Sequence, residues 1–232
     1  MDATWYKDVN NFAVHTAWLH GFMKVYAVYG VGIFAVLVLL GWWFARSQAN
    51  PPRAVASAIW AAAGTIIAVG INQIIANAVA RPRPYLTLHH VEVLVARSTD
   101  YSFPSDHTIT AGAAVTGLWI IAHYSGRATR ALAVVGTILS LFLAFARVYV
   151  GAHYPGDVAG GLVIGTAISL IGWLILRAVL TLAVDRIGTY QPLRPFVFAA
   201  AGTHRAAHAA PRRAEPATSS RPVPDPGRQR QP

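Results

Sequence analysis

The chain has 232 residues, of which 55% are hydrophobic and only 12% are charged. Soluble domains carry about 25% charged residues, so this composition favours an integral membrane protein. The formal net charge of +10 also occurs in nucleic-acid-binding proteins, but here the arginines lie between apolar runs and in the C-terminal tail. Membrane topology explains that arrangement better, and we expect no nucleic-acid partner. The absence of cysteine excludes a disulfide framework and a thiol nucleophile.

Residues 1–24 are expected to form an N-terminal segment that lies along the membrane surface. Trp5, Val9 and Phe12 recur at helical spacing, and polar residues such as Asn10 and Asn11 stand between them. This pattern predicts an amphipathic helix over residues 5–22. Two alternatives stay open, a poorly ordered terminus and a sixth element that crosses the membrane.

Five apolar runs follow, each close to the roughly 20 residues that a membrane-spanning helix needs. We expect spans over residues 25–44, 55–79, 108–123, 131–150 and 158–184. The predicted fold is therefore an all-α membrane bundle of five to six spans, with a membrane-embedded domain over residues 25–198. The remaining segment, residues 199–232, is rich in arginine, proline and alanine. Such a segment buries too little apolar surface to fold, so we expect a disordered tail.

The arginines predict how the bundle is oriented. Those of two loops fall on the same side of a five-span arrangement as the basic tail: Arg46, Arg53, Arg127 and Arg130. Positive residues accumulate on the cytoplasmic side, so we expect the C-terminus inside and the N-terminus outside. Residues 81–107 and 147–157 then share the outer face, where Arg81, Arg83 and Arg97 oppose the topological rule. Ligand binding is the economical reason for their presence.

The run Arg81-Pro82-Arg83-Pro84 predicts a stiff loop that holds two guanidinium groups in place. Each proline fixes its own φ and biases the residue before it towards extended geometry. Guanidinium matches phosphate oxygens bidentately, and Arg147 adds a third cation from another helix end. A single arginine here would be read as a side chain snorkelling to the membrane surface. Three arginines on one face favour an anion site.

The run Pro104-Ser105-Asp106-His107 opens the third expected span. Pro104 suits the first turn of a helix, and the free N–H groups of that turn form an anion site together with the hydroxyl of Ser105. We include Asp106 in this predicted phosphate site. An ordinary Ser/Asp helix cap is the alternative. His107 favours function, because an ionisable group one turn into an apolar span is uncommon.

His153 and Asp157 lie four residues apart across Pro155-Gly156, which predicts a turn into the last span. A carboxylate near an imidazole fixes its tautomer and leaves the other nitrogen free to attack. The alternative is a membrane-surface histidine beside a capping aspartate. With a second histidine, His107, the pair would suit two-step phosphoryl transfer, since one imidazole attacks phosphorus and the other protonates the leaving oxygen.

Metal catalysis is a weaker hypothesis. The outer face offers four acidic residues without the paired-carboxylate spacing of a magnesium or calcium site: Glu92, Asp100, Asp106 and Asp157. The neighbouring His89 and His90 would not point together in a regular element. We therefore expect neither a metal nor a cofactor.

These motifs together resemble the type 2 phosphatidic acid phosphatase (PAP2) superfamily. Its motifs read Lys-x6-Arg-Pro, Pro-Ser-Gly-His and Ser-Arg-x5-His-x3-Asp. They fall in order on Arg83 and Pro84, on Pro104, Ser105 and His107, and on Arg147, His153 and Asp157. The motif match spans about residues 71–161, and the expected spans fit the family layout throughout.

The resemblance implies a role for each matched residue. It assigns His153 as the nucleophile that forms a phosphohistidine, Asp157 as its orienting group and His107 as the general acid. It also implies that Arg83, Arg147 and Ser105 hold the phosphate without a metal.

Three positions depart from the family pattern. The lysine position of the first motif is Ala76, the glycine position is Asp106, and the serine before Arg147 is Ala146. Arg81 is the candidate substitute for the lysine.

The run Ser-Phe-Pro-Ser-Asp-His, the run Val-Gly-Ala-His-Tyr-Pro and Asn72 are similar to the bacitracin-resistance subgroup of undecaprenyl-diphosphate phosphatases. The resemblance implies removal of the terminal phosphate of this C55 lipid on the outer surface of a bacterial cell membrane, which recycles the carrier of cell-wall precursors. Two alternatives stay open. One is the same chemistry on phosphatidylglycerol phosphate, phosphatidate or another prenyl phosphate, and the other is a non-enzymatic binder or transporter of polyprenyl phosphates.

Overall fold

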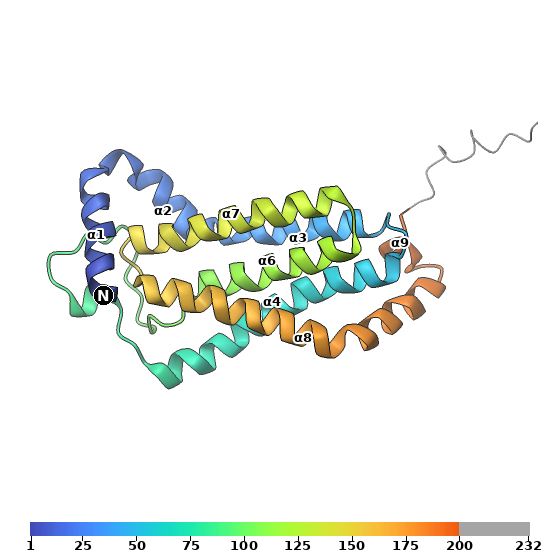
Figure 1. The fold of residues 1–232 in the computed structure, drawn as a ribbon. Coiled ribbons are helices and arrows are strands. Elements are labelled where there is room, and N and C mark those ends of the chain that lie inside the picture. The colour runs from blue at the N-terminus through green and yellow to red at the C-terminus, as the bar shows by residue number, and fades with distance from the viewer. Residues whose placement is uncertain (200–232) are drawn as a thin grey trace, which may run out of the picture. The chain divides into compact units, whose positions relative to one another are not determined.

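The computed structural model describes residues 1–199, which form a bundle of helices (Figure 1). The N-terminal part contains α1 (Asp2–His15), the 3₁₀ turn η1 (Ala17–Leu19), α2 (His20–Tyr29) and α3 (Val31–Ala45). The remainder contains α4 (Pro51–Val79), α5 (Pro84–Thr87), α6 (Asp106–Tyr124), α7 (Arg127–Tyr149), α8 (Pro155–Thr189) and α9 (Arg194–Val197). The expected disordered tail, from residue 200 onward, lies outside the described residues.

The expected all-α membrane bundle is confirmed. Three segments within residues 1–199 are long and apolar enough to cross a membrane: Pro51–Thr87, Arg127–Tyr149 and Pro155–Thr189. The pair Ala17–Tyr29 and Val31–Ala45 makes a fourth if it counts as one span bent by 54°. The remaining expected span is α6, whose 19 residues are long enough for the hydrocarbon core but which is not apolar enough to count among these segments.

Helix α6 occupies the middle of the bundle and packs against α3, α4, α7 and α8. Its buried face is built largely from alanine and glycine, which let neighbouring helices approach closely. A Cβ atom added to Gly112 would lie 2.5 Å from the carbonyl oxygen of Leu162, and one added to Gly165 would lie 2.2 Å from that of Ile109. Helices α6 and α8 therefore touch backbone to backbone, which ties together the two helix ends that carry His107 and Asp157.

The ends of α4 and α8 follow from local sequence. Pro51 and Pro155 stand in the first turns of these helices, where the missing N–H is not needed. In α8, the Asp157 carboxylate accepts a hydrogen bond from the backbone N–H of Tyr154 at 2.9 Å, as an acidic residue does at the third position of a helix. Asp157 is therefore fixed by the start of its own helix.

The expected span over residues 25–44 is not one straight helix. It breaks at Gly30, between α2 and α3, where a Cβ atom would lie 2.4 Å from the carbonyl oxygen of Tyr26. The expected helix over residues 5–22 is also divided, because α1 ends at His15 and a 3₁₀ turn follows Thr16. A position of α1 along the membrane surface stays a prediction.

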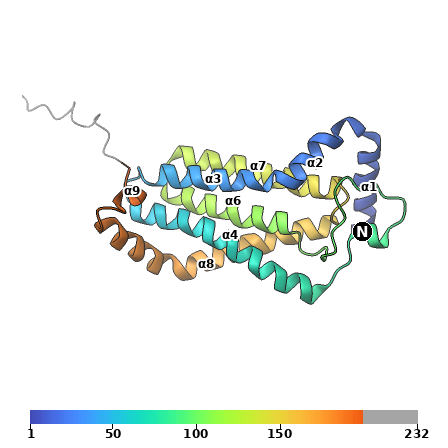
Figure 2. The same ribbon diagram turned by 180° about the vertical axis from the view of Figure 1, so that it is seen from behind.

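Helix α1 stands across one end of the bundle, next to the loops that join α4 to α6 and α7 to α8 (Figures 1 and 2). Tyr6 is fully buried there and packs on the ring of Tyr154 with 5.5 Å between centroids. The Asn10 side chain bonds the backbone of Glu92 twice, donating to its carbonyl oxygen at 2.8 Å and accepting from its N–H at 2.9 Å. Helix α1 is thus attached to both loops.

Candidate active site

A cavity of about 230 Å³ opens at the end of the bundle that α1 crosses. Its polar lining includes most of the predicted site: Arg83, Asp106, His107, Arg147 and His153. These residues come from the loop before α5, the first turn of α6, the last turn of α7 and the loop before α8. The convergence expected from three separate motifs is therefore present, and both histidines face the same cavity.

His153 lies almost completely buried at the base of this cavity, with 2% of its surface exposed. Its Nδ1 lies 2.8 Å from the carbonyl oxygen of Ser102, which can only accept a hydrogen bond, so Nδ1 carries the proton. Nε2 is therefore the unprotonated nitrogen. It lies 3.2 Å from Nη1 of Arg83 and 3.2 Å from Nη2 of Arg147, and it accepts from both guanidinium groups.

Burial lowers the pKa of His153 well below its ordinary value, and the positive charges of Arg147 and Arg83 lower it further. The imidazole is consequently neutral at physiological pH, and the Nε2 lone pair could attack phosphorus once a bound phosphate replaced it as the acceptor of the two guanidinium groups.

Backbone carbonyl groups hold the two arginines in place. Arg83 Nη1 donates to the carbonyl oxygen of Ala152 at 3.0 Å, and Arg147 Nη1 donates to that of Ala27 at 3.1 Å. Both residues are buried, with 5% and 7% of their surfaces exposed. Nε of Arg147 has no hydrogen-bond partner among the described residues. Two fixed guanidinium groups beside one imidazole form a site for a phosphate-sized anion.

Asp100 is a site residue that the sequence reasoning did not assign to this role. Its carboxylate accepts from Arg83 Nε at 3.1 Å and from Nη2 at 2.8 Å. Burial raises the pKa of Asp100, but hydrogen bonds from Ser98 and Arg83 and the charge of Arg83 outweigh it, so the pKa is lowered overall. The ionised Asp100 is the counter-ion of Arg83, and its position in an irregular loop offers no spacing that sequence could detect.

At the start of α6, His107 and Asp106 line the cavity on the side facing α2 and α4. His107 Nε2 lies 3.4 Å from the carbonyl oxygen of Val28. The Asp106 carboxylate accepts from the Asn72 amide at 2.5 Å and from the Gln73 amide at 3.1 Å. Asp106, at the glycine position of the family motif, is therefore held by two side chains of α4. The structural role of Asn72 is to hold Asp106.

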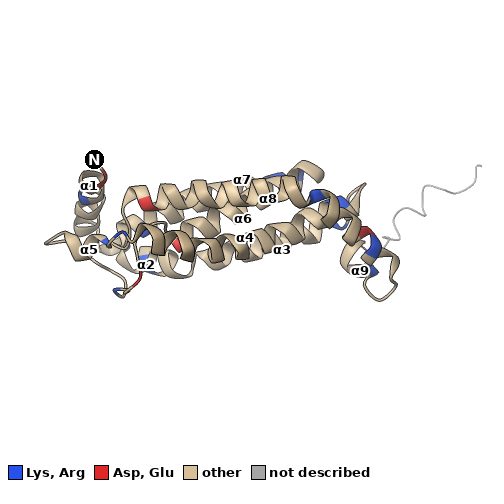
Figure 3. Ribbon diagram, turned by 90° about the horizontal axis from the view of Figure 1, so that it is seen from below, with Lys and Arg blue, Asp and Glu red and all other residues tan. Residues whose placement is uncertain are grey.

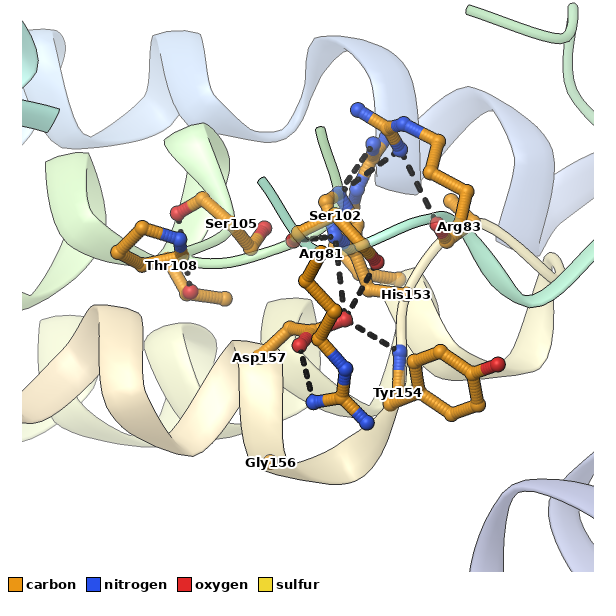
Figure 4. Close-up of polar contacts among 12 residues, drawn as sticks. Arg81, Arg83, Ser102, Ser105, Thr108, His153, Tyr154, Gly156 and Asp157 are labelled. Atoms are coloured by element: carbon orange, nitrogen blue, oxygen red, sulfur yellow. Dashed lines mark hydrogen bonds and ion pairs between the residues drawn. The ribbon is translucent and has the colours of Figure 1, made fainter. Parts of the chain in front are cut away.

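Asp157 does not bond directly to His153, contrary to the simplest form of the prediction. His153 Nδ1 and Asp157 Oδ2 are 3.9 Å apart, beyond hydrogen-bond distance. Ser102 connects them instead, because its hydroxyl donates to the Asp157 carboxylate at 2.5 Å while its carbonyl oxygen accepts from His153 (Figure 4). Ser102 opens the run Ser-Phe-Pro-Ser-Asp-His, but the sequence analysis assigned it no role of its own. Its burial and its hydrogen bonds show that role.

Two predicted phosphate ligands lie outside the cavity lining. Ser105 is fully buried, and its hydroxyl has no partner among residues 1–199. Arg81, the candidate substitute for the missing lysine, instead bonds the carboxylate of Asp157 (Figure 4). Its other terminal nitrogen bonds the carboxylate of Asp2. The guanidinium groups that line the cavity are therefore those of Arg83 and Arg147.

An apolar cleft of about 290 Å³ begins one helical turn below the polar cavity. Val28 and His107 line the cavity, and Val31 and Thr110, three residues further along the chain, line the cleft. Helices α3 and α4 form its walls, and α6 forms its floor. A ligand with an anionic head and an apolar tail could place its head in the polar cavity and its tail in the apolar cleft.

No group of three or more potential metal ligands occurs within the described part of the chain. The expectation of a metal-independent reaction stays a prediction, tested below by chelation.

Comparison of the chain with known proteins identifies a family that it matches. The profile of the PAP2 superfamily matches residues 57–181. Undecaprenyl-diphosphatase BcrC of Bacillus subtilis (strain 168) is 30% identical over 172 residues, which cover 74% of this chain and 81% of that protein. The bacitracin transport permease protein BcrC of Bacillus licheniformis is 27% identical over 149 residues, covering 64% and 66% of the two chains.

Among solved structures, the first transmembrane PAP2-type phosphatidylglycerolphosphate phosphatase from Bacillus subtilis shares the fold, with a TM-score of 0.55. Its identity to the chain is 16%, and the match covers 72% of this chain and 82% of the other. At this identity the likeness concerns the fold alone.

Proposed function

Because the chain belongs to the PAP2 superfamily, we propose that it hydrolyses the terminal phosphate of a polyprenyl diphosphate, with undecaprenyl diphosphate as the substrate. One observation carries the proposal. The unprotonated Nε2 of the buried His153 lies 3.2 Å from two fixed guanidinium groups, those of Arg83 and Arg147. A phosphate bound by these groups would present its phosphorus atom to that nitrogen.

The first step forms a bond between His153 Nε2 and the terminal phosphorus and breaks the bond from that phosphorus to the bridging oxygen. His107 donates a proton to the departing oxygen, so that the lipid monophosphate leaves. In the second step, His107 takes a proton from water as the water oxygen bonds the phosphorus, and the bond between phosphorus and His153 Nε2 breaks. Inorganic phosphate is released and both histidines return to their first states, and these steps require no metal or cofactor.

Charges around His153 support both steps. Phosphoryl transfer depends mainly on positioning and on stabilising negative charge, and Arg83 and Arg147 supply two cations for this purpose. When His153 Nε2 is phosphorylated, Nδ1–H still donates to the Ser102 carbonyl oxygen, and the nearby Asp157 carboxylate stabilises the positive ring.

The apolar cleft below the cavity favours a lipid as the substrate. Its lining of aliphatic and aromatic side chains suits a hydrocarbon tail, and the cavity above it suits a diphosphate head. The name of the Bacillus subtilis relative specifies undecaprenyl diphosphate among such lipids.

We place the site on the outer surface of the cell membrane. Among residues 1–199, the end of the bundle with the cavity carries six basic and six acidic residues, whereas the opposite end carries seven arginines and one acidic residue (Figure 3). The more positive end is expected in the cytoplasm, together with the C-terminus. Because the chain has no cysteine, Thr99→Cys and Ala128→Cys provide single labelling sites at the two ends. An impermeant maleimide should label only Thr99→Cys in intact cells, and the reverse pattern would refute this orientation.

Phosphate release by the purified protein tests the activity. We expect hydrolysis of undecaprenyl diphosphate, undiminished by EDTA, and slower release from phosphatidylglycerol phosphate and phosphatidate. Rapid quenching in alkali should trap labelled phosphate on the wild type but not on His153→Gln. Higher rates on a glycerophospholipid would reassign the substrate, and loss of activity with EDTA would refute the metal-independent mechanism. Binding of undecaprenyl diphosphate without phosphate release would instead favour a non-enzymatic binder or transporter of polyprenyl phosphates.

A further inference from the structure

We infer that Arg81 and Asp2 are positioning residues, which hold the nucleophilic imidazole through Asp157 and Ser102 and do not contact the phosphate. The inference rests on the proposed function in one respect, the role of His153 as nucleophile. It assigns a part in the reaction to the N-terminal helix, which lies outside the three sequence motifs.

The guanidinium group of Arg81 is fixed by three partners. Nη1 donates to Asp157 Oδ1 at 2.6 Å, and Nη2 donates to Asp2 Oδ2 at 2.6 Å. The ring of Tyr154 lies under the same group, 4.1 Å from the guanidinium carbon. Both terminal nitrogens of Arg81 are bound to carboxylates, and Arg81 does not line the cavity. Its guanidinium group is therefore not positioned to bind a phosphate there.

Asp157 connects Arg81 to Ser102, which in turn contacts His153. The carboxylate is fully buried, and its second oxygen accepts from the Ser102 hydroxyl and from the Tyr154 backbone N–H. A buried carboxylate with this many donors is held in one orientation. The Ser102 hydroxyl is thereby fixed, and the Ser102 carbonyl oxygen accepts from His153 Nδ1.

Arg81 also fixes the backbone of Ser102. The Ser102 N–H donates to the carbonyl oxygen of Arg81 at 2.8 Å. Ser102 is therefore held at its N–H directly by Arg81 and at its hydroxyl through Asp157. Its remaining polar group, the carbonyl oxygen, sets the tautomer and ring orientation of His153.

Asp2 connects α1 to this chain of hydrogen bonds. Its Oδ1 accepts from the backbone N–H of Gly156 at 2.8 Å, while Oδ2 accepts from Arg81. A Cβ atom at position 156 would lie 2.8 Å from Asp2 Oδ2, so a side chain there would displace the Asp2 carboxylate. Asp2 thus bridges the first turn of α8 and Arg81, and the packing of Tyr6 on Tyr154 supports the same contact.

The alternative roles predict different kinetics. A phosphate ligand acts on the affinity for substrate and for inorganic phosphate, whereas a positioning residue acts on the geometry of the attacking nitrogen. An ion pair that only supports the fold would change neither the tautomer of His153 nor kcat.

The test compares Arg81→Gln, Arg81→Lys and Asp2→Asn with the wild type, and uses Asp8→Asn as the matched control. Asp8 is an exposed acidic residue of the same helix. We expect Arg81→Gln to lower kcat by about tenfold to a hundredfold, the range seen when a partner that orients a functional histidine is removed. The KM and the inhibition constant of inorganic phosphate should stay within about twofold, since no phosphate contact is lost.

Asp2 is about one-third exposed, so Asp2→Asn should lower kcat by only about two- to fivefold. Arg81→Lys should recover part of the lost rate, because one ammonium group keeps the charge but cannot match both carboxylates. The double variant Asp2→Asn/Arg81→Gln should be no slower than Arg81→Gln alone, because both changes break the same connection. Asp8→Asn should match the wild type.

Imidazole ¹⁵N NMR provides a readout that does not depend on turnover. The His153 signals, assigned by comparison with His153→Gln, should report a protonated Nδ1 in the wild type and in Asp8→Asn, and a reduced share of that tautomer in Arg81→Gln. Absence of hydrolysis by the wild type would refute the proposed function, and the tautomer measurement would still test the positioning role.

Two results would overturn the inference. One is a raised KM and weaker phosphate inhibition at unchanged kcat, which would return Arg81 to the phosphate site. The other is an unchanged His153 tautomer together with an unchanged kcat in folded Arg81→Gln. Folding is checked by gel filtration and thermal unfolding, and Arg81→Lys supplies the same comparison if Arg81→Gln does not fold.

Discussion

The two ends of the bundle use arginine in different ways. At the end with the cavity, Arg81 and Arg83 are paired with carboxylates, and the three arginine–carboxylate ion pairs of the described residues all lie there. At the opposite end, no described arginine is paired with a carboxylate. Arg46 lies over Trp42 and Trp43 at 4.5 and 4.2 Å and donates to the carbonyl oxygen of Pro195. Such contacts are typical of groups that anchor a protein at the membrane surface.

The difference shows that the partner of an arginine indicates whether its exact geometry matters or only its side of the membrane. A paired guanidinium has a defined direction, which a reaction centre requires. A guanidinium resting on a ring needs only its charge and its place on the correct side of the bilayer. Substitutions should therefore affect turnover at the first end and leave it unaffected at the second.

The largest effect is expected at the end with the cavity, for His153, which lies between Arg83 and Arg147. His153→Gln should lower kcat by more than about a thousandfold, because no side chain remains to form the covalent intermediate. Phosphate release from undecaprenyl diphosphate measures this, and undecaprenyl diphosphate binding by the variant shows that the site is intact. Substantial hydrolysis by a folded His153→Gln protein would remove the nucleophile assignment.

A pair of arginine substitutions tests the comparison directly. Arg83→Gln should lower kcat/KM by about a hundredfold, since it removes one of two cations next to the reacting phosphate. Arg127→Gln, at the start of α7 on the opposite end, should leave kcat/KM within about twofold because it contacts no part of the site. Equal losses in both variants would contradict the division between the two ends.

Gly151 tests whether the loop before His153 tolerates backbone change. Its φ of +81° favours glycine, and a Cβ atom there would lie 2.4 Å from the Glu92 carbonyl oxygen. We expect Gly151→Ala to destabilise the protein by about 1–3 kcal/mol and to lower kcat, because the loop must shift. Gly32→Ala, with open space around its Cβ position in α3, is the control and should be neutral in kcat. Unfolding in detergent and initial rates measure both effects.

The smallest expected effect concerns pH. The pKa of His153 lies well below 6.5 in the folded protein because of burial and of the neighbouring Arg147 and Arg83. Below about pH 6.5 the unfolded chain binds a proton at this residue that the folded protein does not bind. The stability of the neutral buried state is thus fully present above that pH and declines as the pH falls towards the folded pKa.

Thermal unfolding followed by tryptophan fluorescence measures this effect. Between about pH 7 and pH 5, the midpoint should fall more steeply for the wild type than for His153→Gln, because the variant lacks this titrating group. Parallel curves would show that His153 is not a buried neutral imidazole.

The prediction of the site succeeded for motif residues that lie at or next to the end of a helix, because the helix end fixes where such a side chain lies. Arg83, His107, Arg147 and His153 each stand at or next to a helix end, and all four reach the cavity. Arg81 was misplaced because alternation with proline predicts a stiff loop but not the direction of a guanidinium group. Its partner Asp2 lies 79 positions away in sequence, and no spacing rule links such residues.

The bundle itself followed from composition and hydropathy, but its breaks did not. The two helices that meet at Gly30 are bent by 54°, and a hydropathy pattern carries no information on helix direction. Asp100 and Ser102 escaped prediction because their roles come from tertiary contacts in an irregular loop.

The apolar cleft limits how much of a long substrate the protein can recognise. A space of about 290 Å³ matches the volume of a small drug-sized ligand, and a 55-carbon chain is far larger. Only the first isoprene units would enter the protein, and the rest of the chain would remain among the lipids. The enzyme should therefore be indifferent to chain length beyond those units, and kcat/KM for a series of prenyl diphosphates in one detergent should reach a plateau. A steady rise up to the full 55 carbons would show that the protein measures the whole chain.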